Sequence, residues 1–159
     1  MENLKEELHL PKLGGKIIAY RQKRFNPEDK ISYDDFDWGV RFFIHGPDRR
    51  YNIADIWIYK SDVPRFANLL ENALKTVTAL QNQSFSGSYT KSFSVPFCSV
   101  RIEAASKSGK ALVTLWVSSS TQTFGIHLTV QEVSIVISKL RSLDQKGQQM
   151  VEALKSLTQ

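Results

Sequence analysis

Two stretches of the chain repeat their apolar residues every three or four positions, a spacing that predicts amphipathic helices. The first begins after a cap at Ser61 or Asp62 and tolerates Pro64 in its first turn. Its apolar stripe is Val63, Phe66, Leu69, Leu70, Ala73, Leu74, Val77 and Leu80. The second follows Thr129 and Glu132, which have the spacing of a capping box. Its stripe is Val133, Val136, Ile137, Leu140 and Leu143, and after Gly147 it resumes at Met150, Val151, Leu154 and Leu157.

Alternating apolar and polar residues elsewhere predict β-strands. The expected strands are 16–25, 38–45, 51–59, 91–105 with a possible break at Pro96, 111–118 and 123–128. Turn-forming residues separate them at 26–29, 46–48 and 106–110. Strands that lead into helices indicate an α+β fold.

The alternation also predicts which side chains share a face of each strand. Trp38, Val40 and Phe42 fall on one face, and Arg41 and Phe43 fall on the other. A small antiparallel sheet buries one face under a helix and exposes the other. The exposed face is therefore expected to carry basic and aromatic residues, namely Arg41, Phe43, His45, Tyr51, Trp57, Tyr59, Arg101 and Trp116.

The two halves of the chain overlay as an internal repeat. In each half an arginine strand, a turn and a tryptophan strand precede a capped helix, with Arg41 and Trp57 in the first half and Arg101 and Trp116 in the second. We expect two antiparallel-sheet-plus-helix repeats, 16–81 and 88–143, within one domain at 16–143. Residues 1–15 are expected to form a flexible arm or short helix, since Pro11 and Gly14–Gly15 interrupt it. Residues 144–159 are expected to be a helical tail, either continuous with the second helix or separate.

Composition narrows the choice of partners. The net charge of +5 favours anionic ligands moderately. The single cysteine, Cys98, excludes a disulfide framework within one chain and is expected to be a buried thiol. The start of the chain lacks the pattern of a signal peptide, and no apolar run is long enough to cross a bilayer. We therefore expect a cytoplasmic protein, in the host cytoplasm if the gene is viral.

The exposed face suggests a site for nucleic acid. Aromatic rings stack on bases, and nearby lysine and arginine neutralise phosphates. Single strands suit this better than duplexes, whose bases are already stacked. An alternative is that Trp57 and Trp116 are core residues, with the faces inverted by a bulge. The candidate site residues are Tyr20, Arg21, Lys23, Arg24, Arg41, Phe43, Arg49, Arg50, Tyr51, Trp57, Tyr59, Arg101 and Trp116.

No motif indicates catalysis or a cofactor. The sequence lacks a glycine-rich phosphate loop, a paired-histidine metal motif and a nucleophile elbow. Asp34, Asp35 and Asp37 are expected to form a solvated acidic loop, with a nuclease metal site as the less favoured alternative. We therefore predict a non-enzymatic protein without metal or cofactor.

The strand-to-helix passages at 56–66 and 125–133 each end a strand in apolar residues, then place Ser or Thr before a capped helix. This pattern resembles the Whirly proteins and the related single-stranded-DNA-binding domain of the transcription coactivator positive cofactor four. The resemblance covers most of residues 16–143 as topology. It implies a ββββα unit that is repeated, binding of single-stranded DNA across the strand surfaces, and oligomerisation.

Together these observations favour a single-stranded nucleic-acid-binding protein with weak sequence preference, acting in replication, recombination or transcription. DNA is the expected partner, with RNA as an alternative, and the protein is expected to form a homo-oligomer. The competing hypothesis is a protein-interaction or scaffold domain that oligomerises through the same aromatic sheet face.

Overall fold

The computed structural model describes residues 3–45, 52–83, 85–95, 98–107, 110–118 and 123–158. Two four-stranded antiparallel sheets, each followed by a helix, make up the chain. The first sheet has the order β1 (Asn3–Leu10), β2 (Leu13–Asn26), β3 (Ile31–His45) and β4 (Asn52–Tyr59). A 3₁₀ turn, η1 (Lys60–Asp62), then leads into α1 (Val63–Asn82). The predicted fold class, α+β with two sheet-plus-helix repeats, is confirmed.

The second repeat has the same order of elements. Its sheet runs β5 (Gly87–Val95), β6 (Cys98–Lys107), β7 (Lys110–Ser118) and β8 (Thr123–Leu128), and α2 (Val130–Thr158) follows. The expected strand 91–105 is instead a hairpin of β5 and β6. The predicted overlay was therefore shifted by one strand, because Arg101 lies on the second strand of its sheet whereas Arg41 lies on the third.

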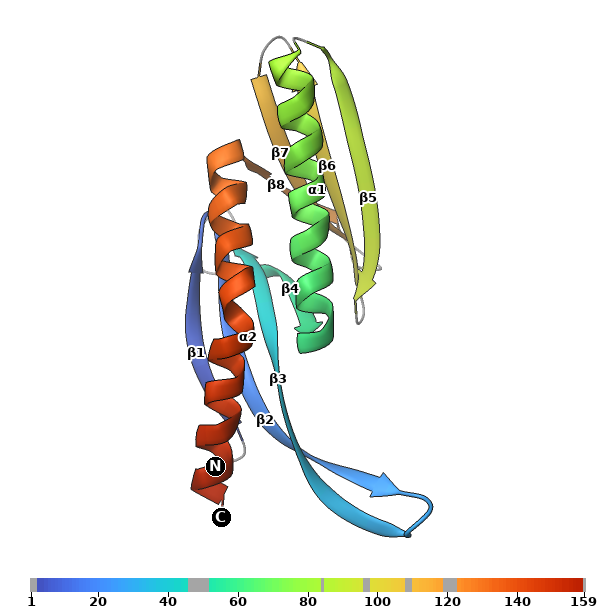
Figure 1. The fold of residues 1–159 in the computed structure, drawn as a ribbon, viewed down its shortest axis with the longest axis vertical. Coiled ribbons are helices and arrows are strands. Elements are labelled where there is room, and N and C mark those ends of the chain that lie inside the picture. The colour runs from blue at the N-terminus through green and yellow to red at the C-terminus, as the bar shows by residue number, and fades with distance from the viewer. Residues whose placement is uncertain are drawn as a thin grey trace.

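Each helix covers the sheet of the other repeat. Helix α1 packs on β5, β6 and β7, and α2 packs on β1, β2 and β3, as Figure 1 shows. The expectation that each half closes its own sheet with its own helix was therefore wrong. Apolar residues from both halves are buried together, and the core is one continuous cluster. We therefore expect the two halves to unfold as one cooperative unit.

The N-terminal segment forms a strand of the first sheet. Residues expected as a flexible arm or short helix form β1, which pairs with β2 through a two-residue turn at Pro11 and Lys12. Lys12 has a φ of 61°, and proline followed by a residue with positive φ is the geometry of a type II turn. Leu8 and Leu13 are buried in the core. Pro11 thus marks a turn between two strands.

Helix α2 is continuous, which resolves the two alternatives for residues 144–159. Its capping box forms as predicted: the amide of Thr129 donates to Glu132 Oε1 at 3.0 Å, and the amide of Glu132 donates to Thr129 Oγ1 at 3.1 Å. The C-terminal half of α2 buries Met150, Val151 and Leu154 against the first sheet. This segment is therefore part of the core.

Gly147 of α2 makes room for a core tryptophan. The indole of Trp38, which is 1% exposed, fills the space that a Cβ at position 147 would need. We expect Gly147→Ala to lower the free energy of unfolding by about 1–3 kcal/mol through overpacking. Alanine favours a helix over glycine by about 1 kcal/mol. Helix propensity alone therefore predicts that Gly147→Ala raises the free energy of unfolding. Urea unfolding measures the change.

The matched control is Gln149→Ala, at an exposed position of the same helical turn. It should leave stability unchanged or raise it slightly. If Gly147→Ala is as stable as this control, the packing of Trp38 against α2 does not require glycine at position 147.

Candidate nucleic-acid interface

The outer face of the first sheet is the one that the alternation predicted. Ile17, Ala19, Trp38 and Val40 are buried beneath α2 and α1. Their neighbours in the strands point the other way: Arg41 and Tyr59 are exposed, and Tyr20, Phe43 and Trp57 are half-buried. The alternative in which Trp57 belongs to the core is not observed. Trp38 is the tryptophan that the core contains.

Three aromatic rings form a cluster on this outer face. The ring centroids of Tyr20 and Trp57 are 5.8 Å apart with an interplanar angle of 60°, and those of Trp57 and Tyr59 are 6.0 Å apart at 87°. Edge-to-face pairs of this kind are favourable. Partial burial, and secondarily the negative charge of Asp37, raise the pKa of the Tyr20 hydroxyl. Tyr20 is therefore a neutral donor at physiological pH.

Glycines in neighbouring strands allow the outer rings to lie close to the sheet. The ring of Trp57 occupies the space above Gly39, and the ring of Phe43 occupies the space above Gly14. In the second sheet a Cβ at Gly125 would lie 2.7 Å from the ring of Trp116. Glycine in a strand marks a close approach of this kind. The rings of Phe43, Trp57 and Trp116 thus lie directly against the backbone of a neighbouring strand.

Three lysines that sequence reasoning missed lie beside the ring cluster. Lys16 is the cross-strand partner of Arg41, which in turn faces Trp57. Lys5 lies on the same face of β1, and Lys60 reaches Asp37 at 3.2 Å. Glu7 lies 3.6 Å from Lys16. Lys5 could have been found only by recognising β1 as a strand, whereas Lys16 has the same parity as Tyr20 in the expected strand 16–25 and could have been found from the alternation.

Three cations of the β2–β3 arm, residues 21–36, form ion pairs within the arm. The arm extends away from the helices as a two-stranded ribbon (Figure 1). Asp34 accepts ion pairs from Arg21 at 2.5 Å and from Lys23 at 2.7 Å, and Asp35 accepts one from Arg24 at 2.6 Å. Asp34, Asp35 and Asp37 therefore lie in β3, and the expectation of an acidic loop was wrong.

The predicted site residues of β2, namely Tyr20, Arg21, Lys23 and Arg24, do not share one face of the strand. Tyr20 and Arg24 lie on one face of β2, whereas Arg21 and Lys23 lie on the other. Residues 21–36 contain four basic and four acidic side chains, so the arm carries no formal net charge. Arg21, Lys23 and Arg24 thus contribute less positive potential than the sequence suggested.

Side-chain hydrogen bonds, mainly from cations, lower the pKa values of Asp34 and Asp35. For Asp35 the main donor is Arg24, followed by Gln22. For Asp34 the donors are Lys23 and Arg21. Because both pKa values are lower in the folded state, this pairing stabilises the arm at neutral pH, and the stabilisation is lost as pH falls through the lowered values.

We expect Arg24→Ala to raise the pKa of Asp35 toward its ordinary value and to leave the pKa of Asp34 lowered. Carboxyl-carbon NMR titration measures both values in one experiment. Asp34 serves as the internal control because its cationic partners are retained. A pKa for Asp35 that does not respond to Arg24→Ala would contradict the pairing.

The outer face of the second sheet differs in character. Trp116 is half-buried, and the guanidinium carbon of its cross-strand neighbour Arg101 lies 5.4 Å from the ring centroid. Arg101 also pairs with Glu103 at 3.1 Å. The remaining positions on this face are mostly hydroxyls, namely Ser88, Thr90, Ser92, Ser99, Thr114, Ser118 and Thr123. This sheet therefore offers one aromatic platform in a polar surface.

Three predicted site residues, Arg49, Arg50 and Tyr51, lie outside the described residues, as does the side chain of Cys98. Within the described part of the chain, no three His, Cys, Asp or Glu side chains gather closely enough to hold a metal ion. None of the described helices has the length and apolarity needed to span a membrane.

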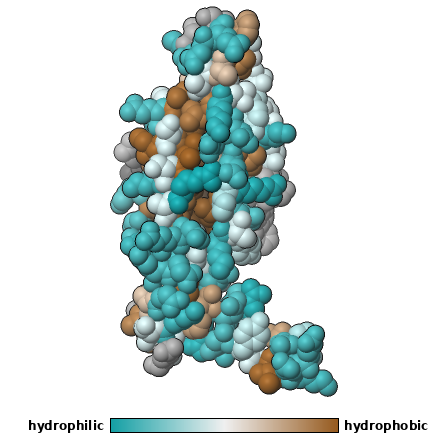
Figure 2. All heavy atoms as spheres, in the orientation of Figure 1, coloured by the Kyte–Doolittle hydropathy of each residue, from teal (hydrophilic) through white to brown (hydrophobic). Residues whose placement is uncertain are grey.

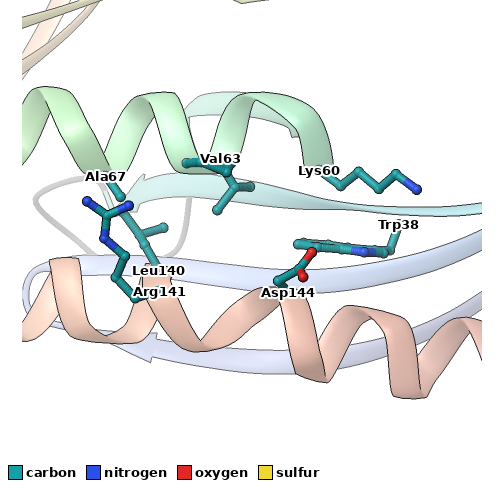
Figure 3. Close-up of a pocket in the computed structure, with 8 residues that line it drawn as sticks. Trp38, Lys60, Val63, Ala67, Leu140, Arg141 and Asp144 are labelled. Atoms are coloured by element: carbon teal, nitrogen blue, oxygen red, sulfur yellow. The ribbon is translucent and has the colours of Figure 1, made fainter.

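A cavity of about 210 Å³ lies between the start of α1 and the middle of α2. Figure 3 shows Trp38 at one side of it, with Asp144 and Leu140 on α2 and Val63 on α1. Its basic residues already have partners: Arg141 donates to Asn68 at 2.6 Å and to Glu71 at 2.7 Å. The cavity lies between α1, α2 and Trp38 of β3, and Lys60, which lines it, also reaches Asp37.

Comparisons with known proteins show similarity only among solved structures. No family model and no curated protein matches the chain. WHY1 from Arabidopsis thaliana is similar at 9% identity and a TM-score of 0.35, over 87% of this chain and 81% of that one. The plant transcriptional regulator PBF-2 is similar at 10% identity and a TM-score of 0.39, over 98% and 87%. WHY3 from Arabidopsis thaliana is similar at 11% identity and a TM-score of 0.34, over 98% and 92%. These are Whirly proteins, and the likeness is one of fold.

Proposed function

We propose that this chain is a non-enzymatic protein that binds single-stranded nucleic acid, with DNA as the first candidate. The observation that carries the proposal is the outer face of the first sheet. There the contacting rings of Tyr20, Trp57 and Tyr59 lie beside Arg41 and Lys16. The preference for sequence is weak, because ring stacking accepts every base.

The geometry favours single strands over duplexes. A ring contributes by stacking on an unpaired base, about 1–3 kcal/mol for each base. Tyr59 is 46% exposed, and the rings of Trp57 and Phe43 lie over glycines, so they form a platform along neighbouring strands. A duplex presents its phosphates and groove edges, which such a platform does not contact.

The surrounding cations predict how binding depends on salt. Lys5, Lys16, Arg41 and Lys60 lie around the rings, with Glu7 and Asp37 among them. If all four cations contact phosphates, log K against log salt should have a slope of about −3 for a single strand. A fluorescent oligothymidylate titrated at several salt concentrations measures this slope. No binding at low salt, or binding indifferent to salt, would remove the proposal.

We expect Arg41→Ala to weaken oligonucleotide binding about three- to tenfold and to make the salt slope shallower by about 0.7, the loss of one phosphate contact. Fluorescence anisotropy with the same oligothymidylate measures both quantities. Lys75→Ala is the matched control, since it removes one exposed cation from α1, away from the sheet face. Equal effects of the two substitutions would indicate an unspecific response to net charge.

A second candidate function is docking on another protein, either a partner or a second copy. The observation that favours it is the β2–β3 arm, where Phe25 and Ile31 are each 60% exposed and Tyr33 is 47% exposed. Figure 2 shows apolar atoms at the tip of this arm among hydrophilic neighbours. An uncovered two-stranded ribbon is marginally stable in water. A stable oligomer in solution that ignores nucleic acid and dissociates on Phe25→Ser would favour this function.

A further inference from the structure

Arg101 covers the aromatic platform of the second sheet. Its guanidinium carbon lies 5.4 Å from the ring centroid of Trp116, within the range of a cation–π contact. Arg101 and Trp116 are cross-strand partners on β6 and β7. The opposite neighbour of Trp116, on β8, is Gly125, which leaves room for the ring. The indole is thus supported by the sheet and covered by one flexible, exposed side chain.

Glu103 holds Arg101 in this position. The two residues are two positions apart on β6, so they share the outer face, and Arg101 Nε lies 3.1 Å from Glu103 Oε1. Both side chains are well exposed to solvent. An exposed ion pair is weak and exchanges easily. A phosphate could therefore replace Glu103 as the partner of Arg101.

The indole nitrogen of Trp116 provides a second, independent observation. Its Nε1–H is shielded from solvent and has no hydrogen-bond partner within the described residues. Buried donors of this kind are usually satisfied. The free protein therefore has both a covered ring and an unsatisfied donor at one place.

We propose that Arg101 and Glu103 form a gate over a one-base subsite at Trp116, an inference that rests on the proposed function. In the free protein the guanidinium occupies the ring face and Glu103 neutralises it. When a single strand binds, one base stacks on Trp116 in place of the guanidinium. Arg101 then pairs with a phosphate of the same strand, and Glu103 loses its partner.

Glu103 consequently acts against binding. It competes with phosphate for Arg101, and its negative charge repels the strand. The isosteric change Glu103→Gln should therefore tighten binding of a fluorescein-labelled oligothymidylate of roughly 20 nucleotides about two- to fivefold. The matched control is Glu152→Gln, which removes the same charge at an exposed position of α2, the helix that covers the inner face of the first sheet.

A second measurement reports on the ring itself. In a Trp57→Phe variant the remaining tryptophans are Trp38, which is 1% exposed beneath the helices, and Trp116. At oligothymidylate concentrations that saturate this variant, as measured by fluorescence anisotropy, the emission of Trp116 should be quenched, because a base replaces the guanidinium on its face. A purely structural role for the Arg101–Trp116 contact would leave the emission unchanged.

The outcomes separate the gate from the proposed function. Tighter binding by Glu103→Gln than by Glu152→Gln, with quenching of Trp116, supports the gate. If the wild-type protein binds but the two variants have equal affinity, or Trp116 is not quenched, the gate is overturned and the proposed function stands. If the wild-type protein does not bind at low salt, the proposed function is overturned and the gate with it.

Discussion

Expressed alone, residues 1–85 are expected to remain unfolded or to aggregate, although they contain a complete four-stranded sheet and its following helix. The reason is the exchange of helices: the buried face of the first sheet is covered by α2, and the apolar stripe of α1 packs on the second sheet. Separating the halves would expose both surfaces to water. Far-UV circular dichroism and urea unfolding test each half.

The same packing predicts that the two fragments recover the fold together. The connection between α1 and β5 is short and exposed at Phe85 and Ser86, so a break there should be tolerated. Co-expressed fragments 1–85 and 86–159 should associate and unfold in one transition. An intact chain with a glycine-serine insertion after residue 85 controls for damage to the connection. Cooperative unfolding of either fragment alone would contradict the exchanged arrangement.

Phe66→Ala is expected to lower the free energy of unfolding by roughly 3–5 kcal/mol, which is a large part of the stability of a typical domain. Phe66 is 2% exposed, and its ring centroid lies 5.9 Å from that of Phe42 in the first sheet. It is therefore placed where α1 passes from one sheet to the other. Removing the ring leaves a cavity at the junction of the two halves. Urea unfolding followed by tryptophan fluorescence measures the loss.

Two other phenylalanines provide contrasts for this substitution. Phe85 is 60% exposed, so Phe85→Ala should change stability by less than about 0.5 kcal/mol. Phe43 lies half-buried on the outer sheet face above Gly14. Phe43→Ala should leave the protein folded and weaken oligonucleotide binding. If Phe43→Ala unfolds the protein while Phe66→Ala does not, the assignment of the two faces is reversed.

Functional interpretation depends on charges that are distant in the sequence. Arg21, Lys23 and Arg24 form a basic run in the sequence, yet each pairs with Asp34 or Asp35 across the ribbon. Lys5 lies in the N-terminal segment 1–15 that was expected to be an arm or short helix, and Lys16 begins the expected strand 16–25. Strands β1 and β2 place both lysines beside the aromatic rings. The candidate interface in the structure therefore lies at the centre of the first sheet, whereas the sequence also placed it on the basic residues of the β2–β3 arm.

Local patterns were sufficient for several features. The apolar spacing predicted both helices, Thr129 and Glu132 predicted the capping box, and alternation placed Val40 inside and Arg41 outside. These features depend on residues within one or two turns or on neighbouring positions of one strand, so a short window contains the necessary information. The strand β1 was missed because Glu6 interrupts its inner face of Leu4, Leu8 and Leu10, and charged residues fill most of its other positions.

The amino-acid sequence was enough to establish which segments become helices, which residues face inward, and that the outward face is aromatic and basic. Tertiary structure alone decided which helix covers which sheet, which cations remain beside the rings, and that Arg101 lies over Trp116. The physical reason is the distance along the chain over which each feature is determined. Periodicity records the environment of each residue along its own element, whereas helix exchange, ion pairing and ring contacts depend on which distant segments meet when the apolar surfaces are buried together.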